Sequence, residues 1–189
     1  MKHFYAIFII TLISILNLDA KDTAHIEYKY SNVMDIPDLS FLNNVYTGLD
    51  ILEQMDFNLL KNKSIAILTN QTAINRSGKH ILDLLKDVQN VDVLFILSME
   101  HGLWGIDDNR AKMIGRDQID PIHGAQIIDM HKTYLTPPKW VMNNIDIILV
   151  DFQDTGSRYT TYLATLSKVF ESAHDYDIPI IVLDRPNPI

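Results

Sequence analysis

The sequence places an acid and an imidazole side by side just after a hydrophobic run. Val93 to Leu97 are five consecutive apolar residues, and Glu100 and His101 follow after two intervening residues. A carboxylic acid at such a position can protonate a leaving group, and a neighbouring imidazole can orient the acid or bind substrate. Both can equally be turn residues, because loops after strands normally carry polar side chains. The case for chemistry therefore depends on whether the pattern recurs.

Three further apolar runs, at 64–69, 145–150 and 178–183, also end in polar side chains. In chain order these side chains belong to Asn70, Gln71, Asp151, Gln153, Asp154, Arg158, Tyr159, Asp184, Arg185 and Asn187. Amides and carboxylates hydrogen-bond sugar hydroxyl and acetamido groups, and a carboxylic acid can protonate a glycosidic oxygen. We interpret the clusters as one polar pocket for a sugar. The alternative for each is a set of helix caps, turn formers and surface charges.

The elements that must position these residues follow from the hydrophobic pattern. All four runs have the length and continuous hydrophobicity of strands that are buried on both faces of a sheet. One helical pattern, at 48–60, precedes the first run, and three others lie between the runs, at 80–88, 137–144 and 159–173. This alternation predicts a Rossmann-like, doubly wound α/β domain with a mainly parallel sheet. Ligands of such sheets bind beyond the carboxyl ends of the strands. The polar clusters come directly after the predicted strands, so they lie at these ends.

Composition and missing motifs exclude several classes of function. The 189 residues carry a formal charge of −8 and no basic cluster, so a nucleic acid would be repelled. Nucleotide-binding glycine fingerprints and a G-x-S-x-G elbow are missing, and there is no cysteine. A metal would have to use Glu100, His101, His123 and Asp107, but adjacent residues rarely both ligate one ion. We therefore expect no cofactor and no metal.

The N-terminus has the pattern of an export signal. Lys2 and His3 precede a mostly apolar stretch from Phe4 to Leu18, and Ala20 offers a small residue for cleavage. We expect a signal peptide over 1–20, a periplasmic or extracellular mature protein, and a linker or arm over 21–46. The alternative is an uncleaved membrane anchor. The remaining residues, 47–189, form the predicted domain.

Four ordered motifs resemble a known family. TNQT at 69–72, MEHGLWG at 99–105, VDFQDTGSRYTTY at 150–162 and LDRPNPI at 183–189 are similar to segments of the NamZ-like exo-β-N-acetylmuramidases, formerly the domain of unknown function DUF1343. The resemblance implies a Rossmann-like domain followed by a second subdomain, with the active site in the cleft between them. It also implies release of N-acetylmuramic acid from the non-reducing ends of peptidoglycan fragments.

The resemblance also implies roles for individual residues. Glu100 corresponds to the catalytic glutamate of the family, and a general acid needs a raised pKa that burial can supply. We assign His101 and Asp154 to the catalytic group with it. The other nine polar residues that follow the three further apolar runs are assigned to substrate binding. Asp151 and Asp184 compete with Asp154 for the role of second carboxylate, and Asp154 is alternatively a helix N-cap.

Two further expectations concern specificity and completeness. Arg158 or Arg185 can pair with the lactyl carboxylate of muramic acid, although Arg185 can instead pair with Asp184 or another carboxylate of the chain. Tyr162 is expected in the core. Because the chain ends just after RPNP, we expect only the N-terminal domain of the family, with the second subdomain missing. The alternative to an enzyme is an inactive sugar-binding or assembly fragment that needs a separately encoded C-terminal half.

Overall fold

The structure, a computed structural model, describes residues 8–10, 45–105 and 119–188. The predicted signal peptide and arm therefore lie outside the described residues, apart from 8–10, 45 and 46. Asp107, one of the metal ligands considered, also lies outside them. Among the described residues, no helix has the length and hydrophobicity that crossing a membrane requires.

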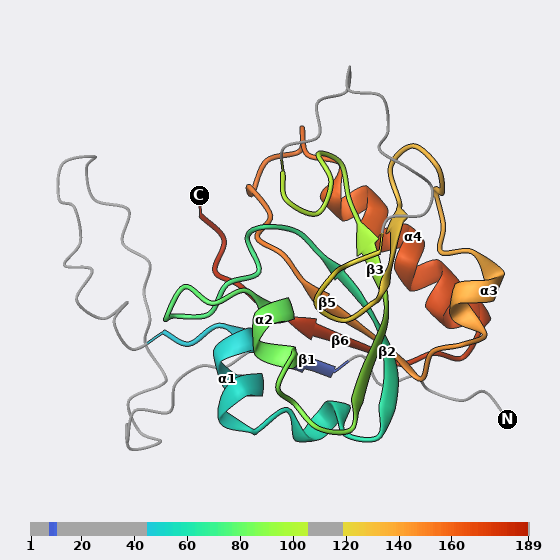
Figure 1. The fold of residues 1–189 in the computed structure, drawn as a ribbon. Helices are drawn as coiled ribbons and strands as arrows, with labels where there is room; N and C mark the ends of the chain where they lie inside the picture. Colours follow the sequence, from blue (N-terminus) through green and yellow to red (C-terminus); the bar gives the residue numbers. More distant parts are fainter. Residues whose placement is uncertain (1–7, 11–44, 106–118, 189) are drawn as a thin grey trace, which may run out of the picture.

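A parallel sheet forms the centre of the domain (Figure 1). Its strands are β1 (Phe8–Ile10), β2 (Lys63–Thr69), β3 (Val91–Ser98), β4 (Gln126–Asp129), β5 (Ile147–Asp151) and β6 (Ile180–Leu183). They pair in the order β1-β6-β5-β2-β3-β4, and every pair is parallel. The chain builds outward in one direction from β2 and in the other from β5. These two neighbours therefore mark the switch point, beside which ligands bind in such sheets.

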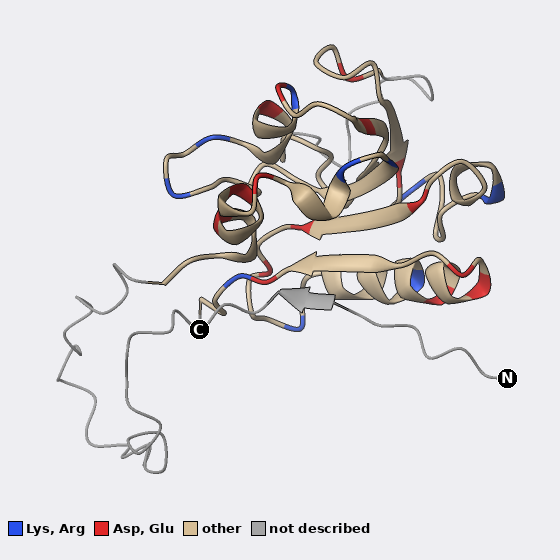
Figure 2. Cartoon of the chain, turned by 90° about the horizontal axis from the view of Figure 1, so that it is seen from below, with Lys and Arg blue, Asp and Glu red and all other residues tan. Residues whose placement is uncertain are grey.

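Helices cover both faces of this sheet. The four α-helices are α1 (Gly48–Gln54), α2 (Ile81–Leu85), α3 (Lys139–Met142) and α4 (Tyr162–Asp175). Alternate residues of β2 enter different cores: Ile65 and Ile67 pack in the cluster that contains α1 and α2, and Ala66 and Leu68 pack in the cluster that contains α3 and α4. Figure 2 shows that charged residues are concentrated in helices and loops, while the strands are nearly free of them. The doubly wound α/β prediction is confirmed.

The predicted helix over 48–60 is shorter than expected. α1 begins with a capping box, in which Thr47 and Asp50 each accept a hydrogen bond from the other's backbone N–H. It ends at Gln54, since Asp56 and Phe57 adopt left-handed backbone conformations, and a 3-10 turn follows at Asn58–Leu60. The apolar stripe of the pattern, which consists of Leu49, Leu52, Phe57 and Leu60, is nevertheless buried, whereas Met55 and Leu59 are exposed. The hydrophobic pattern was right and the single helix was wrong.

Three other elements differ from the prediction. β4 was not predicted, because Gln126–Asp129 supplies only two apolar residues within a polar stretch. β1 comes from the predicted signal peptide. α4 starts at Tyr162, and Tyr159 is 97% exposed instead of continuing the helix. Tyr162 is partly buried and packs edge-on against Phe152, with ring centroids 5.7 Å apart, so it lies at the margin of the core.

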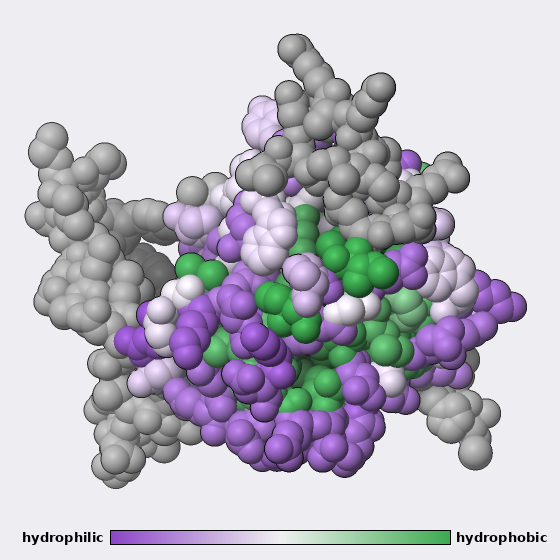
Figure 3. Space-filling view, viewed as in Figure 1, coloured by the Kyte–Doolittle hydropathy of each residue, from purple (hydrophilic) through white to green (hydrophobic). Residues whose placement is uncertain are grey.

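The surface over α1 and α2 is mixed in character. On the face shown in Figure 3, hydrophilic residues cover most of the lower half, and hydrophobic side chains show between them. Exposed large hydrophobic residues include Ile74, Trp104 and Leu163, of which Trp104 lies in the loop after β3.

Candidate functional site

Polar residues gather at the carboxyl edge of the sheet, as the sequence predicted. Asn70 follows β2, Glu100 follows β3, Asp151 ends β5 and Asp184 follows β6. Because all these strands are parallel and adjacent, their carboxyl ends lie on one edge. The residues differ in what holds them and in how exposed they are, and these differences decide what each can do.

Glu100 is held at both carboxylate oxygens. The hydroxyl of Thr161, the residue before α4, donates a hydrogen bond of 2.6 Å to Oε2. Nε2 of His131, which lies just after β4, is 3.6 Å from Oε1. The side chain of Glu100 is 20% exposed, and that of His131 is 29% exposed. The acid is therefore fixed in orientation yet accessible from solvent.

His101 lies in a turn beside this acid. Its backbone is in the left-handed region, with φ of 69°, and its side chain is exposed. The N–H of Gly102 donates to the carbonyl of Met99 and closes the turn. These features support the turn role that was the alternative for His101, and its catalytic role stays a prediction. His131 is the imidazole that the described contacts place at the carboxylate.

Sequence reasoning missed both His131 and Thr161. His131 follows β4, so a prediction of that short strand would have placed the residue at the functional edge. Thr161 was inside a motif that carried the family resemblance, but only charged, amide and aromatic residues of that motif were assigned roles. The hydroxyl of Thr161, one residue before α4, could have been used to predict a polar contact at this edge of the sheet.

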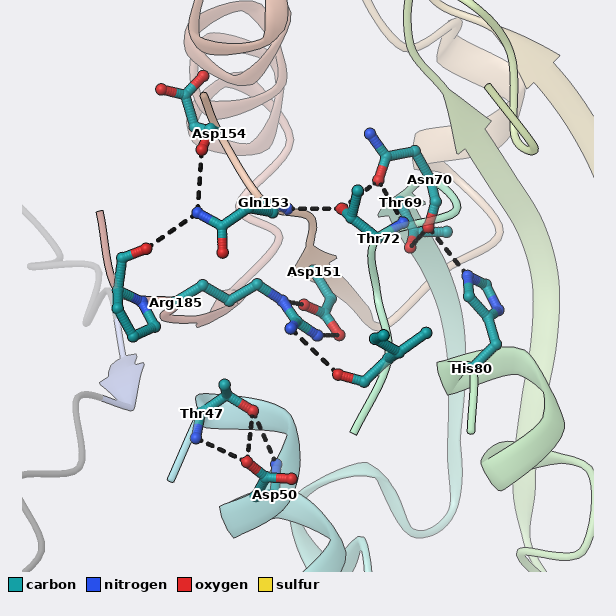
Figure 4. Close-up of polar contacts among 12 residues, drawn as sticks. Thr47, Asp50, Thr69, Asn70, Thr72, His80, Asp151, Gln153, Asp154 and Arg185 are labelled. Carbon is teal, nitrogen blue, oxygen red and sulfur yellow. Dashed lines mark hydrogen bonds and ion pairs between the residues drawn. The ribbon is translucent and has the colours of Figure 1, made fainter. Parts of the chain in front are cut away.

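Asn70 is fully buried and its orientation is fixed by several hydrogen bonds (Figure 4). Its Oδ1 accepts from the backbone N–H and the hydroxyl of Thr72, at 3.0 and 2.5 Å. Its backbone carbonyl accepts from Ala73 N–H and contacts Nε2 of His80 at 2.9 Å. The side-chain nitrogen Nδ2 has no partner among the described residues. A buried donor without a partner is costly.

His80 supports Asn70 through a hydrogen bond to its backbone carbonyl. The N–H of Leu82 donates to Nδ1 at 3.3 Å, so Nδ1 is the acceptor of the ring and Nε2 carries the hydrogen that Asn70 receives. Burial lowers the pKa of His80 below its ordinary value and so favours this neutral ring. Trp104 packs against the same imidazole, with ring centroids 5.1 Å apart.

Asp151 and Arg185 form a buried ion pair at the ends of β5 and β6. Nε and one terminal nitrogen of Arg185 donate to the two oxygens of Asp151, at 2.6 and 3.0 Å, and the other terminal nitrogen donates to the carbonyl of Ile74. Burial raises the pKa of Asp151 to about 6, and the guanidinium opposes that rise. The structural pairing weighed for Arg185 is therefore present, with Asp151 as its partner instead of Asp184. The buried side chains of Asp151 and Arg185 therefore stabilise the carboxyl edge of the sheet from beneath its surface.

Gln153 and Asp154 shape the loop between β5 and α4. The N–H of Gln153 donates to the hydroxyl of Thr72, and its side-chain Nε2 donates to the carbonyls of Asp154 and Pro186. Oδ2 of Asp154 accepts from Gly156 N–H at 2.8 Å, and its Oδ1 accepts from the Thr160 hydroxyl at 3.1 Å. The alternative of Asp154 as a helix N-cap is wrong, because the N-cap of α4 is Thr161. Asp154 instead closes the preceding loop.

A cavity of about 260 Å³ lies beside this loop. Residues after β5, residues after β6 and the first turns of α4 line it, with an apolar floor that includes Phe152 and Leu166. Its predicted site residues are Gln153, Asp154, Asp184, Arg185 and Asn187. Thr160 and Thr161 connect the cavity to the acid, since Thr160 bonds Asp154 and Thr161 bonds Glu100. An apolar floor with a polar rim is typical of small-ligand sites.

The remaining predicted binding residues are exposed. Arg158 and Tyr159 project from the loop before α4, and Gln71 lies over Gly105. Within the described ranges, no three His, Asp or Glu side chains gather as metal ligands would. The described site thus offers a fixed acid, the exposed side chains of Asp184 and Asn187 and an exposed arginine, which together suit a hydroxylated, anionic ligand.

Comparisons with known proteins agree on one family. Residues 65–189 match the family described as exo-beta-N-acetylmuramidase NamZ, N-terminal. Peptidoglycan beta-N-acetylmuramidase NamZ of Bacillus subtilis strain 168 is 33% identical over 144 residues, which are 76% of this chain and 34% of that protein.

Two crystal structures of DUF1343 family proteins from Bacteroides fragilis NCTC 9343 have TM-scores of 0.66 and 0.60, at 29% and 34% identity. Each match covers 76% of this chain and 35% of the solved chain. The chain thus spans about a third of the length of these relatives.

Proposed function

Because the chain belongs to the family of NamZ N-terminal domains, we propose that it is an exo-acting glycoside hydrolase that releases N-acetylmuramic acid from the non-reducing ends of peptidoglycan fragments. The observation that carries this proposal is the fixed carboxyl of Glu100 at the carboxyl edge of the sheet. A general acid must be held within hydrogen-bond reach of the oxygen that it protonates, and two flanking residues hold Glu100.

The proposed step begins with the protonated form of Glu100. The O–H bond of the acid breaks, its proton moves to the glycosidic oxygen, and the sugar–oxygen bond cleaves with its electron pair on the leaving oxygen. Water then adds to the sugar carbon and gives one proton to the Glu100 carboxylate, which restores the acid. Thr161 donates to Oε2, and we assign the transferred proton to Oε1, the oxygen that faces His131.

Binding of the muramic acid residue is assigned to the groups around this acid. Asp184 and Asn187 are exposed and line the neighbouring cavity, so they can hydrogen-bond the hydroxyl and acetamido groups of the sugar, whereas the burial of Asn70 excludes it from contact with substrate. Since Arg185 is committed to Asp151, the lactyl carboxylate is assigned to the exposed Arg158. Asp151 is excluded from contact with substrate by its burial, which leaves Asp184 as the accessible carboxylate that follows a strand.

A second candidate function is an inactive sugar-binding or assembly fragment that pairs with a separately encoded C-terminal half. Its support is the exposed Leu163 and the apolar floor of the cavity beside it, which suit a protein contact. We propose, for either function, that the protein is exported.

The decisive experiment uses a chromogenic aryl β-glycoside of N-acetylmuramic acid. The wild-type chain should release the chromophore, and Glu100→Gln should lower kcat by about 10²–10⁴-fold, since an amide cannot donate the proton. Glu171→Gln, which removes an exposed carboxylate on the surface of α4, is the matched control and should leave kcat unchanged. An active Glu100→Gln variant would assign the acid to another residue. Binding of N-acetylmuramic acid without turnover by the wild-type chain would favour the second candidate.

A further inference from the structure

The register of β3 and β4 brings a histidine to the acid of the proposed site. Ser98 pairs with Asp129 in this parallel ladder, and Met130 N–H donates to the carbonyl of Ser98 at 2.9 Å. Glu100 and His131 are each two residues beyond that last pair. Their side chains meet with Nε2 of His131 3.6 Å from Oε1 of Glu100.

The turn that carries His131 is itself fixed. Asp129 Oδ1 accepts the backbone N–H groups of His131 and Lys132, at 2.8 and 3.1 Å. The carbonyl of Asp129 accepts from Tyr134 N–H at 3.0 Å. The backbone of His131 is therefore anchored, and its imidazole is partly buried against the acid instead of extending freely into solvent.

The second oxygen of Glu100 is held from the opposite element. Thr161 gives its hydroxyl hydrogen to Oε2 at 2.6 Å and makes no side-chain cap to its own helix. One oxygen thus faces β4 and the other faces α4. A carboxyl that is held at both oxygens has its plane fixed, and a fixed plane is what a directed proton transfer requires.

We propose that His131 is a positioning residue for Glu100. It acts through the acid, holding Oε1 in place while Thr161 holds Oε2, and it makes no contact with the sugar. This inference rests on the proposed function, because the orientation of Glu100 matters only if Glu100 performs the proton transfer. A positioning role affects the chemical step and leaves substrate affinity nearly unchanged.

Three substitutions at one position separate this role from simple packing. His131→Leu removes the nitrogen that faces Oε1, and His131→Asn carries an amide on a side chain too short to reach it. His131→Gln places an amide N–H near the position of Nε2. Kinetics of the full chain with the chromogenic muramide should show kcat lowered by about 10–100-fold in the Leu and Asn variants, with KM within about twofold. The Gln variant should recover kcat to within about threefold of wild type.

His174 provides the matched control. It is exposed and lies near the C-terminal end of α4, about 20 Å along the helix from Thr161 at 1.5 Å per residue. His174→Leu and His174→Gln should leave both kcat and KM unchanged. Thermal unfolding of every variant identifies any substitution that acts by loss of fold, and the Asn and Gln pair decides the question if the Leu variant fails to fold.

The outcomes distinguish the two proposals. An active wild-type chain with equally active Leu and Asn variants overturns the role of His131 and leaves the proposed function intact. A raised KM at unchanged kcat, or a Gln variant as slow as the Asn variant, also overturns it. A wild-type chain that neither binds N-acetylmuramic acid nor releases the chromophore overturns the proposed function, and the inference that rests on it falls too.

Discussion

Arg185 and Asp151 join the ends of two neighbouring strands through a pair of hydrogen bonds, at 2.6 and 3.0 Å, between a guanidinium and a fully buried carboxylate. The third contact of Arg185, to the carbonyl of Ile74, ties the loop after β2 to the same group. One side chain therefore connects the segments that follow β2, β5 and β6. The pair stabilises the edge on which the proposed site is built.

Removal of this guanidinium should destabilise the protein in a pH-dependent way. Arg185→Met leaves Asp151 buried without its partner, at an expected cost of about 3–5 kcal/mol near neutral pH. The pKa of Asp151 is already raised to about 6 by burial, and loss of the opposing guanidinium raises it further. Between the ordinary pKa and the raised one, the folded state holds a proton that the unfolded chain has lost, so stability falls as pH rises.

Urea denaturation of the Arg185→Met variant should therefore show a larger loss at pH 8 than at pH 5. Lys168→Met, which breaks an exposed ion pair on α4, is the control and should change stability by less than about 1 kcal/mol at either pH. A loss that is equal at the two pH values would show that the Asp151 carboxyl is not what the guanidinium stabilises.

Gly48 should resist replacement although it lies in a helix. A Cβ at this position would lie 2.5 Å from Cα of Leu183 and 2.6 Å from the backbone nitrogen of Asp184. Gly48→Ala should thus push α1 away from the end of β6 and cost about 1–3 kcal/mol, despite the better helix propensity of alanine. Thermal unfolding measures the effect.

Gly78→Ala is the comparison for this prediction. No atom lies within 4 Å of a Cβ there, so its cost comes only from a positive φ of 77° and should be about 1–2 kcal/mol. The Gly48 variant should also weaken binding of N-acetylmuramic acid, because Asp184 lines the cavity, whereas the Gly78 variant should not. Equal binding by both would separate the packing of α1 from the site.

Arg158 should discriminate muramic acid from glucosamine. Only N-acetylmuramic acid carries the lactyl carboxylate, and a hydrogen-bonded charge pair contributes about 1.5–3 kcal/mol. Arg158→Ala should weaken binding of N-acetylmuramic acid by about tenfold or more and leave N-acetylglucosamine unaffected, as measured by calorimetry. Lys168→Ala, which removes a cation from the outer surface of α4, should change neither affinity. A variant that keeps its preference would assign the lactyl group to another residue.

The exported protein should begin near Lys21. Cleavage there removes β1, which pairs with β6 through only three residues, and leaves five strands whose cores are formed by the later elements. A chain that starts at Lys21 should therefore unfold cooperatively, with the same far-UV circular dichroism per folded residue. Mass spectrometry of the exported protein checks the terminus. An intact Met1 would support the uncleaved anchor instead.

The sequence predicted those parts of the fold that depend on continuous hydrophobic patterns. The strands β2, β3, β5 and β6 follow from their apolar runs, whereas β4 has only Ile127 and Ile128 between polar residues. The break after α1 depends on left-handed backbone conformations at Asp56 and Phe57. The types of these two residues are not enough to predict such a conformation. Local backbone geometry of this kind is decided by packing.

The site was predictable in its location but not in its pairings. Parallel strands brought the polar clusters to one edge, as expected. Which carboxylate Arg185 binds depends on β5 and β6 being neighbours, and strand order cannot be read from hydrophobicity. The contact of His131 with Glu100 required both β4 and its register with β3. The motifs thus pointed to Glu100 and not to His131 and Thr161, the two residues that contact its carboxylate.

His80 links the pH of the medium to the start of α2. Its ring receives one hydrogen at Nδ1, from the start of α2, and gives one at Nε2, to the carbonyl of Asn70. An added proton has no place on this ring unless the bond to Leu82 breaks. Since burial holds the pKa of His80 below its ordinary value, the arrangement persists as pH falls below the range in which a free imidazole gains charge. When protonation does occur, the bond from Leu82 at the first turn of α2 is lost, while Nε2 keeps its hydrogen bond to the carbonyl of Asn70.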